Sequence, residues 1–462
     1  MRTKDRYDVV IVGAGAFGLA SAYHLIDRRP ELSVLVVDAR SGPGEGSMGA
    51  SAAMVRDVFS SSDNRQLARS SIAFYRHLMD EHEELRGTSP LLDLYGYLWL
   101  LPERYMNEYR DLVRKSGGTL DARPVELSDV RSCPGLDPAP SRWYEGDAAP
   151  PPEAIAGGLF GRTCGAVAPE KLANFYFAAA RARGVDFAFG LCVQRLSFEG
   201  REELLLHEPS KLPYAFQDRI PGRLRIARVV FGDGSFVRTD RVIVAAGAWA
   251  EHLLHPVGIA TACSPRPQLL FSVSGQEVDR LLGWAPPVDP IDVPTGRPRL
   301  PFVILPTGAT MKPIFGERRI WMGGVDRVAH PIGTREDPST EGALDYRADR
   351  LGDREAFATD VLPAVTPYFP GFDTTGLRLE SSWGGYYHFS PEGLPVLTEE
   401  ACGVIFVGGD SGSGVMKADA IGRLVAALYD GAREARLFRG DSYRLDRLSL
   451  DHRAVEEERI IL

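Results

Sequence analysis

A glycine-rich turn near the start of the chain has the spacing of a dinucleotide site. Gly13-Ala14-Gly15-Ala16-Phe17-Gly18 follows the apolar stretch Asp8–Val12 directly and opens a helical pattern. Gly13 permits the tight turn, Gly15 lets the backbone approach a pyrophosphate, and Gly18 lets helix and strand pack closely. The free N–H groups at such a helix N-terminus, together with the positive end of its dipole, attract the phosphates.

A carboxylate stands at the distance that this kind of site requires. Asp38 comes 20 residues after Gly18, at the end of the next apolar stretch, Leu32–Val37. There it can accept hydrogen bonds from ribose hydroxyls. An ordinary strand-to-helix turn would leave Asp38 without a role, so the pattern favours dinucleotide binding.

Two later segments place small residues beside expected strand ends. The stretch Val242–Trp249 contains Ala245-Ala246-Gly247, which lets backbone approach a flat cofactor, although a simple strand end explains it equally well. Gly408–Gly414 places four glycines and two serines before a helix expected from about Val415. Donors there can stabilise negative charge on a reduced cofactor. Since Asp410 would oppose that charge, we expect it to cap the helix or point away.

The elements that position these turns fall in three separated pieces of the chain. The sequence predicts a strand, a turn and a helix in succession at residues 7–37, around residues 229–250, and at residues 403–429. Within the second piece, Gly232-Asp233-Gly234 predicts a hairpin turn between two strands. We therefore expect one α/β domain assembled from three pieces, with a second domain inserted between them.

The bulk composition restricts the classes of function. A length of 462 residues suits two or three domains, and 44% hydrophobic residues are ordinary for a globular protein. The net charge of −9, without a basic stretch, argues against nucleic acid. Apolar runs are far below the ~20 residues of a membrane span, and no secretory signal precedes the first strand, so we expect a cytoplasmic protein. The five cysteines form no CxxC pair and predict neither a disulfide framework nor a metal site.

The sequence resembles the D-amino-acid oxidase superfamily of FAD-dependent oxidoreductases, and within it the sarcosine oxidase, proline dehydrogenase and dimethylglycine dehydrogenase relatives. The resemblance follows one order along the chain, in the segments Val9–Gly18, Gly46–Arg56, Val242–Trp249, Trp383–Pro395 and Val407–Gly422. It implies a Rossmann-like α/β FAD-binding domain and an α+β substrate domain whose antiparallel sheet covers the flavin. The implied ranges are residues 1–90, 155–262 and 366–462 for the FAD-binding domain, and residues 91–154 and 263–365 for the substrate domain.

The resemblance also implies which residues contact FAD. Besides the first glycine turn and Asp38, they are Ala39, Arg40, Ser47, Ala52, Ala53, Met54, Val193, Ala246, Gly247, Trp249, Gly409, Asp410, Ser411, Gly412, Ser413, Gly414, Val415, Met416 and Lys417. Some relatives attach FAD through a cysteine or a histidine, and the matching positions here are Gly385 and Ala50. We therefore expect non-covalent FAD.

The resemblance implies that Arg56 is the first candidate for binding the substrate. An arginine ends the same eleven-residue stretch in sarcosine oxidases and proline dehydrogenases, and Arg56 matches it without a gap. A guanidinium holds a carboxylate through two parallel hydrogen bonds, which also fixes the orientation of the substrate. The alternative is a surface ion pair with Asp57 or Asp63.

Tyr387 and Lys312 complete the predicted catalytic set. Tyr387 matches a pocket tyrosine of sarcosine oxidases, where an aromatic face excludes water and can meet a cationic amine; core packing is the alternative. Strand alternation sends its neighbours Tyr386 and His388 to the opposite face, so we expect His388 to be packed or exposed rather than a base. Lys312 falls where relatives often carry a basic residue facing the pocket, although we expect it to be exposed to solvent.

One departure from the relatives bears on the electron acceptor. The lysine that activates oxygen in sarcosine oxidases aligns with Trp321. Without a fixed positive charge, superoxide formation beside a flavin is less favoured. This favours a dehydrogenase over an oxidase, with oxygen, a quinone or an electron-transfer protein as the open choices of acceptor. A quinone would place the protein at the periphery of a membrane.

The sequence thus predicts an FAD-dependent oxidoreductase that oxidises the C–N bond of a small amino acid or N-alkyl amino acid, of the sarcosine, proline or D-amino-acid class. Its expected substrate is a small amine that carries a carboxylate. Two alternatives stay open. One is an oxidoreductase of 2-hydroxy acids or glycerol phosphate, whose anions Arg56 could hold equally well. The other is a non-catalytic assembly factor with structural FAD, against which the retention of Arg56 and Tyr387 speaks.

Overall fold

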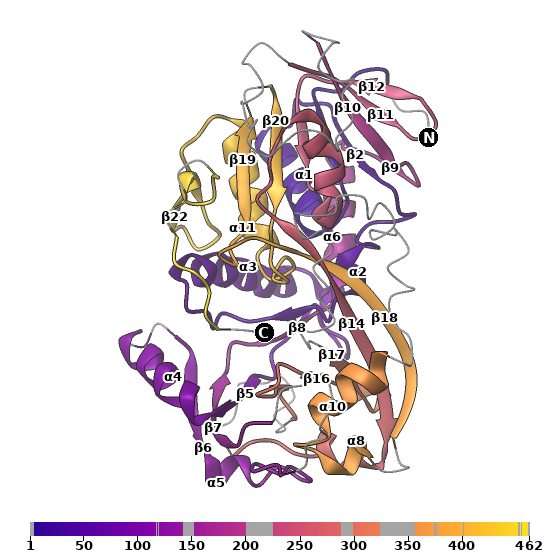
Figure 1. The fold of residues 1–462 in the computed structure, drawn as a ribbon. Coiled ribbons are helices and arrows are strands. Elements are labelled where there is room, and N and C mark those ends of the chain that lie inside the picture. The colour runs from indigo at the N-terminus through magenta and orange to yellow at the C-terminus, as the bar shows by residue number, and fades with distance from the viewer. Residues whose placement is uncertain are drawn as a thin grey trace.

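The computed structural model describes residues 4–116, 118, 120–141, 152–199, 225–287, 299–323, 356–373, 377–400, 402–450, 453 and 455–460. Two large sheets, each with its own layer of helices, make up most of the fold (Figure 1). Within these residues, no helix combines the length and the apolar character needed to cross a membrane.

The first sheet is assembled from the three predicted pieces. Its strand order is β19-β20-β13-β1-β2-β9, and all neighbouring pairs are parallel except β19–β20. The strands are β1 (Val9–Val12), β2 (Val34–Asp38), β9 (Asp186–Phe189), β13 (Val242–Val244), β19 (Val396–Glu400) and β20 (Val404–Gly408). The continuous apolar runs of the central strands are typical of a parallel sheet that is buried on both faces.

Each face of this sheet packs against a different layer. In β1, Val9 and Ile11 belong to a core shared with four helices, whereas Val10 and Val12 pack against a three-stranded sheet. The helices are α1 (Ala16–Arg28), α3 (Ser62–Glu81), α6 (Pro169–Ala182) and α11 (Ala418–Tyr429), and the small sheet is β10 (Val193–Glu199), β11 (Arg225–Phe231) and β12 (Phe236–Arg238). With both faces covered, the carboxyl ends of the strands are the place for a ligand.

The second sheet has eight strands in the order β18-β14-β17-β16-β15-β5-β7-β6, antiparallel except for the pair β15–β5. The strands are β5 (Tyr97–Pro102), β6 (Ala122–Glu126), β7 (Ile155–Gly161), β14 (Ser264–Gly275), β15 (Phe302–Ile304), β16 (Thr310–Ile314), β17 (Arg319–Gly323) and β18 (Leu377–Phe389). One face packs on α5 (Leu127–Val130), α8 (Gln276–Leu282) and α10 (Leu362–Val365), and the other on α4 (Glu103–Lys115).

Two long strands join the two halves. Strands β14 and β18 reach from the eight-stranded sheet up to the first sheet (Figure 1), where a bridge pairs Phe389 with Asp410. Shorter elements complete the described fold: α2 (Ser47–Ala50), α7 (Ala250–Leu254), β3 (Met54–Val55), β4 (Leu92–Asp93), β8 (Gly165–Val167), β21 (Glu434–Arg436) and β22 (Ser442–Arg444).

The predicted fold class, a Rossmann-like α/β half with an antiparallel-sheet α+β half, is confirmed. The hairpin at Gly232-Asp233-Gly234 is also confirmed, because β11 and β12 pair across it. The helix expected from about Val415 begins later, at Ala418, since residues 414–417 form turns. The domain ranges remain a prediction. Strands β7 and β18 fall in ranges assigned to the FAD-binding domain but pair within the eight-stranded sheet, where β5, β6 and β14 supply their hydrogen-bond partners.

Candidate functional site

A cavity of about 910 Å³ lies where the two halves meet, at the carboxyl ends of β1, β2 and β13. Its wall continues onto β14 and β18 through residues 268–270 and 385–389. The position is the crevice outside the strand ends, where open α/β sheets bind their ligands. Its volume is near the upper end of the ~300–1,000 Å³ range of ligand cavities, so it suits a large cofactor with a small substrate.

Most of the predicted site residues line this cavity. They are Gly13, Gly15, Ala16, Phe17, Asp38, Ala39, Arg40, Ser47, Ala52, Ala53, Met54, Arg56, Val193, Ala246, Gly247, Trp249, Tyr387, Asp410, Ser411, Gly412, Ser413, Gly414, Val415 and Met416. Four others, Gly18, Gly409, Lys312 and Lys417, lie behind its wall. Gly409 packs against Cys263: a Cβ added to Gly409 would lie 2.8 Å from Sγ of Cys263.

The first glycine turn has the geometry that its spacing predicts. Gly13 has φ +104°, and a Cβ added to Gly18 would lie 1.9 Å from the carbonyl oxygen of Gly13, so each position requires glycine. A Cβ added to Gly15 meets nothing within 4 Å and would extend into cavity space. No side chain caps the N-terminus of α1 at Gly15, and its first turn holds no acidic residue. The positive end of α1 is therefore open to the phosphates of a dinucleotide.

Asp38 closes this turn from the end of β2. Its Oδ2 accepts a hydrogen bond from Ala14 N–H at 2.6 Å, and its Oδ1 accepts one from Arg40 N–H at 2.8 Å. A carboxylate oxygen has lone pairs for more than one donor, so Asp38 can fix the turn and still accept ribose hydroxyls. The glycine geometry, the open helix end and the cavity volume together fit FAD.

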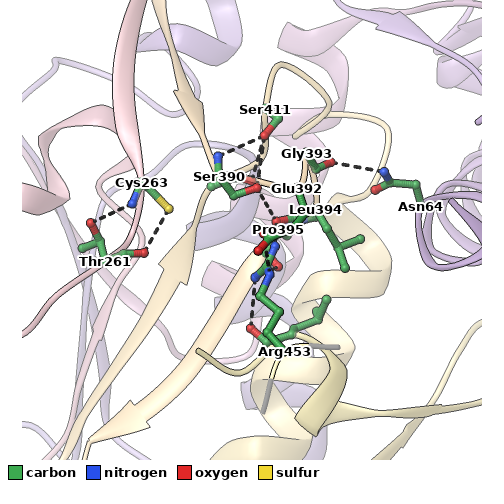
Figure 2. Close-up of polar contacts among 12 residues, drawn as sticks. Asn64, Thr261, Cys263, Ser390, Glu392, Gly393, Leu394, Pro395, Ser411 and Arg453 are labelled. Atoms are coloured by element: carbon green, nitrogen blue, oxygen red, sulfur yellow. Dashed lines mark hydrogen bonds and ion pairs between the residues drawn. The ribbon is translucent and has the colours of Figure 1, made fainter. Parts of the chain in front are cut away.

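The second glycine turn, after β20, is held by side chains from both halves of the molecule. Asp410 Oδ2 accepts from Gly414 N–H at 3.0 Å, which caps the turn that precedes α11 rather than the helix itself. His388 Nδ1 accepts from Gly409 N–H at 3.1 Å. Figure 2 shows Ser390 and Ser411 meeting at the same turn, where Ser390 N–H donates to Ser411 Oγ at 3.1 Å.

Arg56 is a buried cation at the cavity wall. Its side chain is 3% exposed, which excludes the alternative of a surface ion pair: Asp57 pairs with Arg69, and Asp63 pairs with Arg447. Nη1 donates to the carbonyl of Val58 and Nη2 to that of Ile460, each at 3.1 Å.

Arg56 keeps hydrogen-bonding capacity that these two carbonyls do not use. Its Nε is buried without a hydrogen-bond partner, and no carboxylate of the described residues lies within ion-pair distance of the guanidinium. The ring of Phe59 lies 4.2 Å from its Cζ and contributes a cation–π contact. A buried cation that pairs directly with no carboxylate is costly unless a ligand supplies the partner, so the arrangement favours a carboxylate ligand.

Tyr387 lies at the cavity on β18, against the second glycine turn. A Cβ added to Gly412 would lie 2.8 Å from its ring, so the two are in close contact. Its two neighbours are more deeply buried than Tyr387, as strand alternation predicts. Tyr386 is 3% exposed and packs on Trp249, and His388 is 1% exposed. Because His388 Nδ1 accepts a hydrogen bond, its Nε2 carries the hydrogen and donates to Glu251 at 2.7 Å. His388 is thus a packed residue.

The expectation that Lys312 is exposed to solvent is wrong. Its side chain is 8% exposed, and Nζ donates to the carbonyl of Ala52 at 2.6 Å. Strand pairing places it opposite Trp321, whose ring lies 4.6 Å from Nζ. Burial lowers the pKa of Lys312 to about 8. Lys312 therefore supports the cavity segment at Ala52 from behind.

This burial predicts a pH-dependent contribution to stability. Since the pKa of Lys312 is lower in the folded chain than the usual 10.5, the unfolded chain binds more protons between about pH 8 and pH 10. The free energy of unfolding of the native protein should rise relative to Lys312→Met over that window, by at most about 3 kcal/mol. Denaturant titrations at both ends of the window measure this, with the exposed Lys115→Met as control. An equal pH dependence of native protein and Lys312→Met would contradict it.

Lys417 also lies behind the wall, although we predicted it as an FAD contact. It is fully buried, and Nζ donates to Asn64 Oδ1 at 2.6 Å and to Ser413 Oγ. Burial lowers its pKa to about 7. Through Ser413, which does line the cavity, Lys417 fixes the second glycine turn from the core side.

Residues near the C-terminus also belong to the site, and no sequence pattern predicted them. Glu458 and Ile460 line the cavity, close to Arg56. They stand in no recognisable motif and more than 400 positions after Arg56, so no local signal in the sequence marked them.

Comparisons with known proteins agree with this geometry. The family model described as "FAD dependent oxidoreductase" (DAO) matches residues 8–428. The "FAD-dependent oxidoreductase domain-containing protein 1" of Xenopus laevis is 25% identical over 447 residues, covering 92% of this chain and 79% of that protein. The bovine (Bos taurus) protein of the same name is 25% identical over 435 residues, covering 92% of this chain and 81% of that protein.

Solved structures share the fold at lower sequence identity. L-proline dehydrogenase from P. horikoshii superposes with a TM-score of 0.65 at 18% identity, covering 93% of this chain and 95% of that one. Glycine oxidase from Geobacillus kaustophilus gives a TM-score of 0.64 at 20% identity, covering 93% and 96%. The family match spans most of the chain, and the cavity fits its cofactor: this chain belongs to the DAO family of FAD-dependent oxidoreductases.

Proposed function

We propose that this protein oxidises the C–N bond of a small amino acid or N-alkyl amino acid. The observation that carries the proposal is Arg56, a buried guanidinium at the cavity wall that pairs with no carboxylate of the described residues and has N–H groups beyond the two bound to carbonyls. A substrate carboxylate would supply the missing charge through two parallel hydrogen bonds. Two structural neighbours, L-proline dehydrogenase and glycine oxidase, are named as enzymes of amino acids, which supports this substrate class.

The proposed FAD site uses the predicted contacts that line the cavity. The open end of α1 at Gly15 would hold the pyrophosphate, Asp38 the ribose, and Val193 would lie at the adenine end. The second glycine turn would meet the flavin ring, with the backbone N–H of Gly412 as a donor; the N–H groups of Ser411, Ser413 and Gly414 already donate to His388 and Asp410. When bound, FAD supplies the acceptor for the hydride.

The chain itself contributes orientation and exclusion of water. Arg56 would fix the carboxylate, and Tyr387, which also lines the cavity, would exclude water with an aromatic face that can also contact a cationic amine. Oxidation removes a hydride from the carbon and a proton from the nitrogen, which leaves an imine. Water then converts the imine into a carbonyl compound and an amine or ammonia. The engagement of His388 with Glu251 leaves it outside this reaction.

The proposed electron acceptor is a molecule other than oxygen. Of the described residues that line the cavity, none is a lysine, and Trp321 aligns with the oxygen-activating lysine of the sarcosine oxidases that the sequence resembles. Lys312 lies behind Ala52 and donates to its carbonyl, and Lys417 lies behind Ser413 and donates to its hydroxyl. This supports a dehydrogenase, since superoxide formation beside a flavin is less favoured where no lysine of the described cavity lining stabilises it.

We expect the purified protein to be yellow and to release all of its FAD on acid or heat denaturation. The two attachment positions, Ala50 and Gly385, lie together at the cavity, where a Cβ on Gly385 would be 3.3 Å from that of Ala50, and neither can form a bond to flavin. Flavin fluorescence is measured in the supernatant and in the protein band of a denaturing gel. Fluorescence that stays with the band would contradict the prediction.

The reaction is tested by its products. Candidate amino acids and N-alkyl amino acids are incubated with the holoenzyme and an artificial electron acceptor, and released amine or ammonia is measured alongside acceptor reduction. C–N oxidation predicts one amine or ammonia released for each two electrons transferred from an acyclic substrate. From a cyclic amino acid it predicts one ring imine, or its ring-opened amino carbonyl form, for each two electrons. Acceptor reduction by 2-hydroxy acids alone, without amine release, would replace the proposal with C–OH oxidation. Parallel assays with oxygen as the sole acceptor test the preference for a dehydrogenase.

A further inference from the structure

The C-terminal arm, residues 453 and 455–460, forms one end of the cavity. In Figure 1 the yellow arm passes one end of α3 and runs toward the region between the two large sheets. Glu458 and Ile460 both line the cavity. The arm has no helix or strand of its own, so side chains and backbone contacts must hold it in place.

The first anchor is Arg453, whose side chain is 6% exposed. Its Nε lies 2.8 Å from Glu392 Oε2, and its guanidinium donates to the carbonyls of Leu394 and Pro395 (Figure 2). These partners belong to the turn that follows β18. Arg453 therefore attaches the arm to the turn after β18. Ser390, in the same turn, donates to Ser411 of the second glycine turn.

The second anchor is Glu458, which is bound at the N-terminus of α3. Its Oε1 accepts from Ser60 N–H at 2.8 Å and from Ser60 Oγ at 2.9 Å, and its Oε2 accepts from Ser61 N–H and from Asn64 Nδ2, each at 3.1 Å. The N-terminus of a 20-residue helix favours a negative charge, and free backbone N–H groups there bind carboxylates strongly. Glu458 is thus fixed by donors that carry no positive charge of their own.

The same carboxylate orders the last residues of the arm. Glu458 Oε1 also accepts from Ile460 N–H at 3.0 Å. Ile460 is 2% exposed and packs in the apolar cluster that contains Trp99. Its carbonyl then accepts from Nη2 of Arg56 at 3.1 Å. A continuous chain of contacts therefore runs from the N-terminus of α3 through Glu458 and Ile460 to Arg56.

We infer that the C-terminal arm is part of the substrate site and that Glu458 is a positioning residue for Arg56. Carbonyls of Val58 and Ile460 take one N–H each of the five that a guanidinium carries, which fixes its plane and leaves one further N–H on each of Nη1 and Nη2 for the substrate carboxylate. Without the arm, the guanidinium would lose one of its two orienting acceptors and gain access to water. The inference rests on the proposed carboxylate role of Arg56.

The test measures benzoate binding to the holoenzyme, by the perturbation of the flavin absorption spectrum. Glu458→Ala is compared with Glu458→Gln, which keeps one acceptor oxygen, and with Glu457→Ala, which removes the adjacent exposed carboxylate. Each is also made in the Arg56→Ala background, because residues that act through one another show non-additive effects. FAD content and thermal stability are recorded for every variant.

We expect Glu458→Ala to weaken benzoate binding about tenfold, Glu458→Gln by less, and Glu457→Ala not at all, with FAD content unchanged. In the Arg56→Ala background, loss of Glu458 should have no further effect. Two results would overturn the role of the arm and leave the proposed function standing. One is that loss of Glu458 weakens benzoate binding by the same factor in the native and Arg56→Ala backgrounds. The other is that both Glu458 variants bind benzoate normally while Arg56→Ala binds it more weakly. Unchanged binding in Arg56→Ala would overturn both. Should Glu458→Ala not fold, Glu458→Gln decides by the same comparison.

Discussion

Replacement of Arg56 by alanine is expected to reduce kcat/KM by roughly 30-fold to several thousand-fold, while FAD content stays unchanged. The lost contact is a charge-assisted hydrogen-bonded pair in a buried site, where removal of one partner costs about 2–5 kcal/mol. At 1.36 kcal/mol per factor of ten, this gives the stated range. The 3% exposure of Arg56 places the effect well above that of a surface pair, which is worth ~0–1 kcal/mol.

Arg56→Lys separates charge from geometry. An ammonium restores the charge but cannot hold both carboxylate oxygens in one plane, so recovery should be partial. Steady-state kinetics and flavin absorbance of both variants give the measurement. A loss below about threefold for Arg56→Ala would remove the requirement for a carboxylate, and simple amines or esters would become equally good candidates.

Gly15→Val is expected to abolish FAD binding and leave a folded apoprotein. A Cβ at Gly15 meets no protein atom within 4 Å, and its φ of −83° suits any residue, so the fold tolerates valine. The added side chain would instead occupy the space through which the backbone approaches the pyrophosphate.

The matched control is Gly18→Val, whose Cβ would lie 1.9 Å from the carbonyl oxygen of Gly13. We expect this variant to lose stability as well as FAD, because the clash is within the protein. Flavin content and thermal unfolding distinguish the two variants. Normal flavin content in Gly15→Val would show that the turn does not carry the pyrophosphate.

Local patterns predicted the parts of the site that lie on one stretch of chain. The first glycine turn follows β1, Asp38 is the last residue of β2, and the second glycine turn starts at the end of β20. Strand period and turn chemistry therefore determine where these residues lie. The alternation of Tyr386, Tyr387 and His388 likewise follows from the period of a strand. These predictions needed no knowledge of which strands are neighbours.

Features that depend on distant contacts could not be predicted in this way. Lys312 is charged and follows a Met in a short strand, which suggests exposure, yet the pairing of β16 with β17 and contact with Ala52 bury it. The arm lacks any motif, and its position depends on Glu458 meeting the start of α3, nearly 400 residues earlier in the chain. In both cases long-range packing determines where the residues lie, and no short stretch of the sequence indicates that packing.

The central claim, that a carboxylate-bearing amine reduces the flavin, is tested most directly by anaerobic flavin bleaching with matched compounds on one carbon skeleton. An amino acid, the 2-hydroxy acid with the same side chain, and the amine without the carboxylate are each mixed with the holoenzyme, over a panel of small side chains. We predict that for at least one skeleton the amino acid bleaches the flavin far faster than its two analogues. Bleaching by the hydroxy acid alone, or equal bleaching by the amine that lacks the carboxylate, would contradict the claim.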